Sequence, residues 1–365
     1  MAKADWAIVV GIKNYFDPDL VGLEGPENDA REFYDWIVSA DGGAVPKDQA
    51  KLIASSDYPP FTTSTTAMPT AEAIKGAFDH IRSIADENEQ KGLGRNVGER
   101  LYLFFSGHGF APSQHDDLTA LLTAEASVAG AHLTHIIGSY MADFFWRARF
   151  FDEILLFMDC CRSVMECAQL YMPYEDERAT DYYMGRRFYA YGARTTMESR
   201  EWKMADGQYH GVFTRTLLDA LSGTGYDPRD PSKITAESLR DQLYNGFKNF
   251  MSAPDRQRPD LPKEPEVVYE QKPGGNFTIV TRANLAQRIL GLKKVTKYGV
   301  TILVSPGRVG KEATIRDKNL AVVSEETLAA PTMLSLERGF YAINIAGESE
   351  PLPFEVTGAG GEVHV

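Results

Sequence analysis

Blocks of hydrophobic residues alternate with amphipathic stretches through the larger, N-terminal part of the chain. Continuous apolar runs rich in β-branched and aromatic residues predict buried strands, at Trp6–Ile12, Ala50–Ser55, Glu99–Ser106, Glu153–Met158 and Phe188–Ala193. Apolar residues at helical spacing predict helices, at Pro26–Ala40, Thr70–Ala85, Val212–Leu221 and Thr235–Phe250. Asn28 or Asp29 is a candidate cap of the first helix, and Thr70 of the second. This alternation predicts an α/β fold, with a parallel sheet covered by helices on both faces.

The pattern changes near residue 295. Short alternating segments separated by turn residues predict strands, at Val300–Val304, Ala313–Arg316, Thr332–Leu336, Tyr341–Ile345, Phe354–Val356 and Glu362–Val365. A helix is expected only at Ser324–Ala329, so this part reads as a small all-β sandwich. The segment Pro254–Gly275, rich in proline and charge, is expected to be an irregular connection. We therefore divide the chain into domains 1–294 and 295–365.

The composition of the chain argues against several classes of function. The chain has 365 residues and a formal net charge of -13, which argues against nucleic-acid phosphate as a partner. Its three cysteines, Cys160, Cys161 and Cys167, lie within eight residues, so a disulfide framework is not expected and a reducing compartment fits. The N-terminal apolar run is too short for a membrane span and lacks a cleavage signal. We expect a soluble cytoplasmic protein with no membrane association.

Two predicted strands end in reactive tips. One ends Ser106-Gly107-His108-Gly109, and the other ends Asp159-Cys160-Cys161. The carboxyl ends of parallel strands meet at one edge of a sheet, where ligands bind. A cysteine nucleophile needs a nearby base, which His108 can supply to Cys161. The backbone N–H groups of Gly109 and Cys161 could form an oxyanion hole.

Each of these residues also has a plain structural interpretation. A lone histidine or a lone buried cysteine usually serves packing, and we assign that role to Cys160 and Cys167. The combination of His108 and Cys161, each after a predicted strand, favours catalysis.

At these residues the sequence resembles the caspase-like cysteine proteases (clan CD, peptidase C14), on the metacaspase and paracaspase side. The motifs that carry the resemblance, in family order, are Ile12–Tyr15, Asn28-Asp29-Ala30, Ser106–Gly109, Asp159–Cys161 and Gly211–Thr214. His108 precedes Cys161 by 161 − 108 = 53 residues, similar to the roughly 50 residues of caspases. The resemblance implies the caspase–haemoglobinase fold and a Cys/His dyad.

The resemblance also implies a pocket for the side chain before the scissile bond, the P1 side chain. Asp29, Asp159 and Glu201 match acids that line this pocket in metacaspases and paracaspases, and Ser106 matches a further pocket residue. Acids there would bind an arginine or lysine through charge-assisted hydrogen bonds, so cleavage after Arg or Lys is expected. The plainer alternatives are a helix cap for Asp29, a strand-end acceptor for Asp159 and a solvated loop acid for Glu201.

The sequence departs from the family in two places. Metacaspases commonly carry His-Ser-Gly after the nucleophile, where this chain has Arg162-Ser163-Val164, which leaves the local turn open. Calcium-dependent members have an acidic cluster between the histidine and the cysteine, where this chain offers only His115-Asp116-Asp117, Glu125 and scattered acids. No metal or other cofactor is expected, and calcium activation stays an alternative.

Two further segments suggest regulation. Residues 164–187 read as a loop in which Arg178, Arg186 and Arg187 would suit self-cleavage by a basic-specific protease. The region Tyr298–Val365 resembles the PEGA-like β-sandwich modules often appended to bacterial enzymes. It is expected either to bind an activator or docking partner or to cover the protease domain.

Three candidate functions can be weighed against these sequence features. The first is a regulated effector endopeptidase acting on proteins with a basic P1 residue, as in bacterial defence. The second is a catalytically silent module of the same fold that acts through its β-sandwich, and the intact His108–Cys161 pair argues against it. The third is an amidase of α/β-hydrolase type, against which the absence of a G-x-C-x-G elbow speaks.

Overall fold

The computed structural model forms two compact units, Met1–Ala286 and Gln287–Val365, each considered by itself. The residues that the structure describes are 5–113, 115, 118–128, 133–165, 169–174, 185–194, 201–204, 207–251, 256–258, 261–262, 264–269, 276–281, 298–317, 322–336, 339–348, 350–356 and 361–365.

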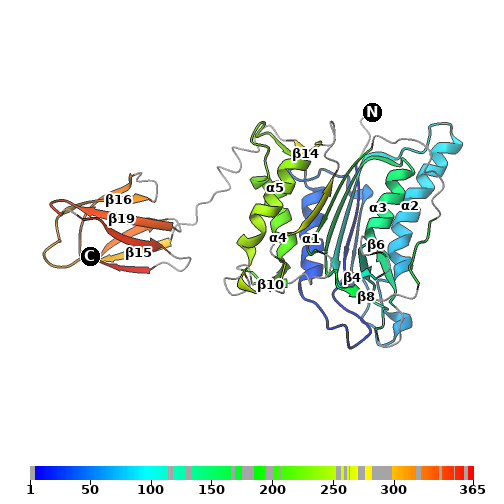
Figure 1. Cartoon of the computed structure of the whole chain (residues 1–365), viewed down its shortest axis with the longest axis horizontal. Helices are drawn as coiled ribbons and strands as arrows, with labels where there is room; N and C mark the ends of the chain where they lie inside the picture. Colours follow the sequence, from blue (N-terminus) through cyan, green and yellow to red (C-terminus); the bar gives the residue numbers. More distant parts are fainter. Residues whose placement is uncertain are drawn as a thin grey trace. The chain divides into compact units, whose positions relative to one another are not determined.

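A six-stranded sheet forms the centre of the first unit (Figure 1). Its strands lie in the order β13 (Glu266–Tyr269), β9 (Arg186–Tyr191), β7 (Phe151–Cys160), β3 (Gly98–Gly107), β1 (Trp6–Gly11) and β2 (Ala50–Ala54). Neighbouring strands are parallel, except that β13 is antiparallel to β9. The strands β1, β3 and β7 are almost wholly buried, as expected of strands covered on both faces.

Helices cover both faces of this sheet. Figure 1 shows one group on one side of the sheet, namely α1 (Gly25–Val38), α4 (Val212–Asp219) and α5 (Ala236–Gly246). On the other side lie α2 (Ala71–Gln90) and α3 (Gly138–Arg147). Thr70 accepts the N–H of Ala73 at 3.1 Å, which confirms the predicted cap of α2. The cap prediction for α1 is wrong, because the helix begins at Gly25, before Asn28 and Asp29.

Short strands surround the carboxyl edge of the sheet. They are β4 (Gly109–Pro112), β5 (Ala120–Leu122), β6 (His135–Ile137), β8 (Val164–Met165), β10 (Glu201–Lys203) and β11 (Tyr209–Gly211). A further antiparallel pair joins β12 (Lys233–Thr235) to β14 (Thr278–Thr281). Short 3₁₀ turns occur at Lys47–Gln49, Ser55–Asp57, Ser64–Thr66 and Phe247–Phe250, and a π-helical turn at Ala220–Thr224 follows α4. The short strands form the walls around the strand tips.

The second unit is all β within its described residues. One sheet contains β18 (Thr332–Leu336), β15 (Tyr298–Leu303) and β21 (Gly361–His364). The other contains β17 (Val322–Thr327), β16 (Glu312–Asp317), β19 (Gly339–Ile345) and β20 (Leu352–Val356). The two sheets share one hydrophobic cluster, which is the packing that a β-sandwich requires.

The predicted strands and helices of the first unit are confirmed, with shifted ends. Two expectations are wrong. Where a helix was expected at Ser324–Ala329, the chain forms strand β17 as far as Thr327, and Ser324 pairs with Ile315. The connection expected to be irregular contains β13, which completes one edge of the large sheet. Four-residue segments such as β13 are too short for periodicity to reveal, and pairing with a neighbour stabilises them.

No helix in the described part of the chain is both long enough and apolar enough to cross a membrane.

A buried ion pair joins the sheet to the peripheral β14 strand. Nε of Arg100 on β3 lies 2.6 Å from Oε2 of Glu153 on β7. The same guanidinium donates to the carbonyl oxygens of Thr278 and Ile279, at 2.8 and 2.7 Å. Glu153 is only 2% exposed, and Arg186 of β9 also bonds to it. The arginine therefore links three strands through one buried group.

Removing Glu153 should destabilise the first unit strongly. We expect Glu153→Ala to lower the free energy of unfolding by about 3–5 kcal/mol, because it leaves a buried guanidinium without its carboxylate. The matched control is Glu87→Ala, whose ion pair with Lys91 is more than 60% exposed on both sides and should contribute less than about 1 kcal/mol. Urea unfolding followed by tryptophan fluorescence reports on this unit, since it contains all four tryptophans. Equal losses for the two variants would contradict the role of the buried pair.

Candidate active site

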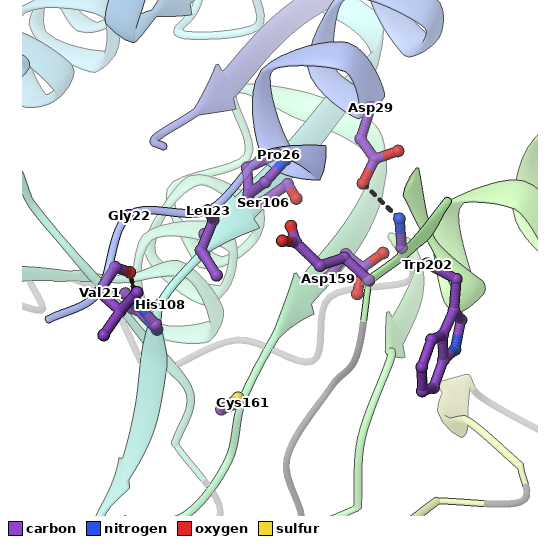
Figure 2. A pocket seen from close by; sticks show the side chains of 13 residues that line it. Val21, Gly22, Leu23, Pro26, Asp29, Ser106, His108, Asp159, Cys161 and Trp202 are labelled. Atoms are coloured by element: carbon purple, nitrogen blue, oxygen red, sulfur yellow. Dashed lines mark hydrogen bonds between the residues drawn. The ribbon is translucent and has the colours of Figure 1, made fainter. Parts of the chain in front are cut away.

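One cavity brings the predicted site residues together (Figure 2). Its volume is about 410 Å³, and it lies at the carboxyl ends of β3 and β7. Six of the seven predicted site residues line it, namely Asp29, Ser106, His108, Asp159, Cys161 and Glu201. The seventh, Gly109, directly follows His108. Segments far apart in the sequence therefore meet at the edge where parallel strands present their tips.

The tip of β7 separates its two adjacent cysteines. Cys160 is 2% exposed and packs in the main hydrophobic cluster, and burial raises the pKa of its thiol well above the ordinary value. Cys161 is half-buried and lines the cavity. Arg162 points back into the protein, where it lies 2.7 Å from Glu266 and over the ring of Tyr191. The residue that replaces the family's histidine thus anchors the turn after Cys161.

The tip of β3 is held by Tyr15. The tyrosine hydroxyl accepts the backbone N–H of His108 at 2.7 Å and donates to the carbonyl of Ile12 at 3.0 Å. Its ring also contacts the imidazole, with the centroids 4.8 Å apart. Gly107 has a φ of +153°, and a Cβ there would lie 2.7 Å from the tyrosine hydroxyl. Glycine is therefore required where the backbone passes Tyr15.

The imidazole of His108 has a backbone partner on a neighbouring loop. Its Nε2 lies 2.8 Å from the carbonyl oxygen of Val21, and Figure 2 shows this contact at the cavity rim. Because a carbonyl oxygen only accepts, Nε2 carries a proton in this contact. Nδ1 is then the nitrogen that can take a proton from a thiol in the neutral ring.

Gly109 begins β4 immediately after the histidine. A Cβ at this position would lie 2.8 Å from the Cβ and Sγ of Cys160 and 2.6 Å from the carbonyl oxygen of Ala120. This close approach brings the backbone after His108 against the tip that carries Cys161.

Two buried carboxyl groups form the inner end of the cavity. Asp29 is 1% exposed, with Oδ1 at 2.9 Å from Nδ1 of His210 and Oδ2 accepting the N–H of Gly211 at 2.9 Å. Asp159 is 5% exposed and accepts from the N–H and Oγ1 of Thr214, at 3.1 and 2.7 Å. A Cβ at Gly211 would lie 1.9 Å from Asp159, so glycine permits this approach.

Burial changes the acid strength of Asp29. Burial raises its pKa to about 7. The hydrogen bond from His210 opposes this shift, and the negative charge of Asp159 adds to it. The Asp29 carboxyl can therefore gain or lose its proton near neutral pH.

Glu201 has a structural partner as well as a place at the cavity. Its carboxylate accepts the N–H groups of Glu24 at 3.1 Å and of Gly25 at 2.7 Å. These N–H groups belong to the start of α1, where unpaired donors and the helix dipole favour an anion. Glu201 thus caps α1 from β10, which excludes its interpretation as a merely solvated loop acid.

Several lining residues carried no sequence signal of their own. They are Val21, Gly22, Leu23, Pro26 and Trp202, whereas Gly107 and Gly211, which also line the cavity, belong to motifs that the sequence analysis identified. His210 was also missed, although it directly precedes the motif Gly211–Thr214. Only its contact with Asp29, 181 positions away, reveals its place.

The structure describes only some of the residues on which the calcium hypothesis and the self-cleavage hypothesis rest. Glu125 accepts the N–H of Ala71 at the start of α2, at 3.0 Å. Across the described residues, no group of three His, Cys, Asp or Glu side chains is placed to hold a metal ion. Asp116, Asp117 and Arg178 lie outside the described residues.

Arg186 and Arg187 do not lie in a loop, which corrects the expectation for this end of residues 164–187. They begin β9, which pairs with β7 on one side and β13 on the other. Arg187 also bonds to Asp143 at 2.9 Å. Because a protease needs an accessible extended segment, the structure argues against cleavage at these two residues.

Comparisons with known proteins identify the family of the chain and a probable protease among its relatives. A family model described as the Caspase domain, peptidase C14, matches residues 4–273. A probable protease from a Desulfuromonadales bacterium is 27% identical over 235 residues, covering 60% of this chain and 26% of the relative. The chain thus spans about a quarter of the length of this curated relative.

Solved caspase structures are also similar. Caspase-1 from Spodoptera frugiperda is 12% identical with a TM-score of 0.46, covering 78% of this chain and 93% of that chain. A structure of pro-sf-caspase-1 is 12% identical with a TM-score of 0.41, covering 73% and 91%.

Removing the hydroxyl of Tyr15 should loosen the β3 tip. We expect Tyr15→Phe to lower the free energy of unfolding by about 1–3 kcal/mol, because the N–H of His108 loses its acceptor. The control is Tyr226→Phe at an exposed tyrosine, which should change it by less than about 0.5 kcal/mol. Urea unfolding followed by tryptophan fluorescence measures both. A Tyr15→Phe protein as stable as the wild type would show that this hydroxyl does not hold the tip.

Proposed function

The chain belongs to the caspase-domain family, peptidase C14, and from this premise we propose that it is a cysteine endopeptidase that cleaves proteins after Arg or Lys. One observation carries the proposal: a single cavity joins the half-buried thiol of Cys161 and the imidazole of His108 to two buried carboxyl groups. A cysteine beside a histidine is the arrangement that nucleophilic catalysis needs. Acids at the inner end of a cavity bind cationic side chains.

The reaction proceeds in two steps, formation of a thioester on Cys161 and then its hydrolysis. Sγ of Cys161 attacks the scissile carbonyl carbon while its proton passes to His108. The backbone N–H groups of Cys161 and Gly109 hold the oxyanion of the tetrahedral intermediate. The C–N bond then breaks, and His108 gives its proton to the departing amine. Water, deprotonated by the same imidazole, hydrolyses the thioester and frees the thiol.

The carbonyl oxygen of Val21 orients the base. Its contact with Nε2 of His108 fixes the ring and stabilises the imidazolium that forms in each step. This leaves Nδ1 to exchange the proton with Cys161.

The P1 pocket is formed by Asp29 and Asp159, with Ser106 and Glu201 on its wall. The two aspartates are deeply buried, so a charged hydrogen bond to a guanidinium or ammonium group there is strengthened by the low dielectric. An aspartate side chain would meet two like charges in the same place, which disfavours cleavage after Asp.

The protease role is assigned to residues 1–294 and a docking role to residues 295–365. Met333 and Phe340 in the second part are 73% and 64% exposed, so this part has apolar side chains available for contact with a partner. A regulated effector role in the cytoplasm, as in bacterial defence, fits a protease with such a module.

Hydrolysis of matched fluorogenic peptides tests the nucleophile and the pocket together. We expect turnover of peptides ending in Arg or Lys, little turnover of the Asp peptide, and none with Cys161→Ala or His108→Ala. Asp29→Asn and Asp159→Asn should each raise the KM for the Arg peptide about tenfold or more, because a buried charge-assisted bond is lost. Each assay is run with chelator and with added calcium.

Preferred cleavage after Asp would overturn the pocket assignment. If no peptide is cleaved, an Arg-directed electrophilic probe distinguishes a missing activator from a silent fold. Labelling of the wild type, but not of Cys161→Ala, supports a protease. Absence of labelling favours the catalytically silent binding module.

The preference for arginine should depend on pH. Since the folded pKa of Asp29 is about 7, its carboxyl is charged above that pH and becomes neutral below it. The KM of the Arg peptide should therefore rise as pH falls, approaching tenfold per pH unit below 7. A peptide ending in citrulline, which has the shape of arginine without its charge, controls for titration of the dyad. If the ratio of the KM values for the Arg and citrulline peptides stays constant from about pH 5.5 to about 8.5, the role of Asp29 is contradicted.

A further inference from the structure

A chain of polar side chains runs from the P1 pocket to the surface. Asp29 contacts Nδ1 of His210 at 2.9 Å, and the Nε2 of the same ring lies 3.6 Å from Oε1 of Glu32. Arg215 bonds to the other oxygen of Glu32. The chain begins at a carboxyl group inside the cavity and ends at an ion pair outside it.

Three elements build this chain. Asp29 and Glu32 lie three residues apart on α1, which places them on the same face of the helix. His210 comes from β11, and Arg215 comes from α4. The side chains of Asp29 and His210 are each 1% exposed, whereas those of Glu32 and Arg215 are 40% and 29% exposed. The imidazole is thus a buried link between a buried acid and a surface acid.

The charges around His210 favour its protonated form. Burial works to lower its pKa, but the hydrogen bond that His210 donates to Asp29 and the charges of Asp29 and Glu32 raise it above the ordinary value, against the opposing charge of Arg215. A histidine between two carboxylates is stabilised as the imidazolium. Asp159 on β7 also faces Asp29, and Glu201 of β10 lines the same cavity.

Two buried carboxylates in one pocket repel each other when no substrate is bound. A cation behind one of them reduces this repulsion and favours the ionised form of that carboxyl. His210 is placed to do this for Asp29, because its Nδ1–H is directed at Oδ1 while the N–H of Gly211 occupies Oδ2.

We propose that His210 is the positioning residue of the P1 pocket: it orients Asp29 and favours its ionised form, with Glu32 favouring the proton on its ring. The inference rests on the proposed basic specificity and adds how that specificity is set. The charge of the pocket then depends on a relay that reaches the surface and not on the two aspartates alone.

Arg and citrulline peptides test the role through KM, kcat and pH. For His210→Phe, which keeps a ring without the donor, we expect the KM of the Arg peptide at pH 7 to rise about tenfold while kcat stays within about twofold. The pH midpoint at which the ratio of the Arg and citrulline KM values changes should move up by about one pH unit, because Asp29 loses both a donor and a positive neighbour. His210→Asn restores a neutral donor and should recover part of the KM but less of the midpoint shift. Glu32→Gln, at a half-exposed position, should move the midpoint the same way by a smaller amount.

Nuclear magnetic resonance of labelled histidine in the wild type gives a second measurement that needs no variant. The His210 ring should titrate above the ordinary histidine value of about 6.5. A reversible peptide argininal should lower that value, because the bound cation takes over the role of the imidazolium. The matching citrulline aldehyde should change it much less.

The outcomes separate this inference from the proposed function. A wild type that does not prefer arginine over citrulline contradicts the basic specificity itself. A wild type that does prefer arginine, with an unchanged ratio and midpoint in His210→Phe and Glu32→Gln, overturns the role of His210 alone. Equal losses of kcat on both peptides would show a purely structural role and would also overturn it. If His210→Phe does not fold, a His210 ring that titrates at or below the ordinary histidine value in the wild type likewise overturns the role.

Discussion

The site depends on the register between β3 and β7. In this parallel pair, Gly107 lies opposite Cys160, so the next residue on each strand, His108 and Cys161, leaves the sheet at neighbouring tips. A slip of one residue would turn each side chain to the other face of the sheet. The register is fixed because both strands are buried on both faces, so a slip would have to repack the whole core.

Contacts with neighbouring segments hold the tips of β3 and β7 in place. Tyr15 holds the N–H of His108, and Val21 holds its ring. Arg162 anchors the chain just after Cys161 through Glu266 on the edge strand β13. The proposed base, His108, and the proposed nucleophile, Cys161, are thus each supported from outside their own strand. Such external support is what a catalytic pair requires to keep a productive geometry.

The electrostatics of the cavity follow from burial. Two carboxyl groups that are 1% and 5% exposed would be costly if both were charged and unpaired. The protein compensates with directed donors, from Gly211 and His210 to Asp29 and from Thr214 to Asp159. Both carboxyl groups therefore have hydrogen-bond donors within the protein, which offsets part of the cost of burying them.

The sequence by itself determined the α/β class, the buried strands, the all-β character of the C-terminal unit and the two reactive tips. Each of these follows from local patterns, because a strand buried on both faces is a continuous apolar run whatever its partners are. The sequence could not supply the short strands, which are stabilised by pairing, and it misassigned β17 as a helix. Nor could it show that Glu201 caps α1 or that His210 contacts Asp29. These contacts join residues that are 177 and 181 positions apart in the chain. Only the tertiary structure decided these contacts, because the packing of α1 against β11 brings the groups within hydrogen-bond distance and no local pattern encodes that packing.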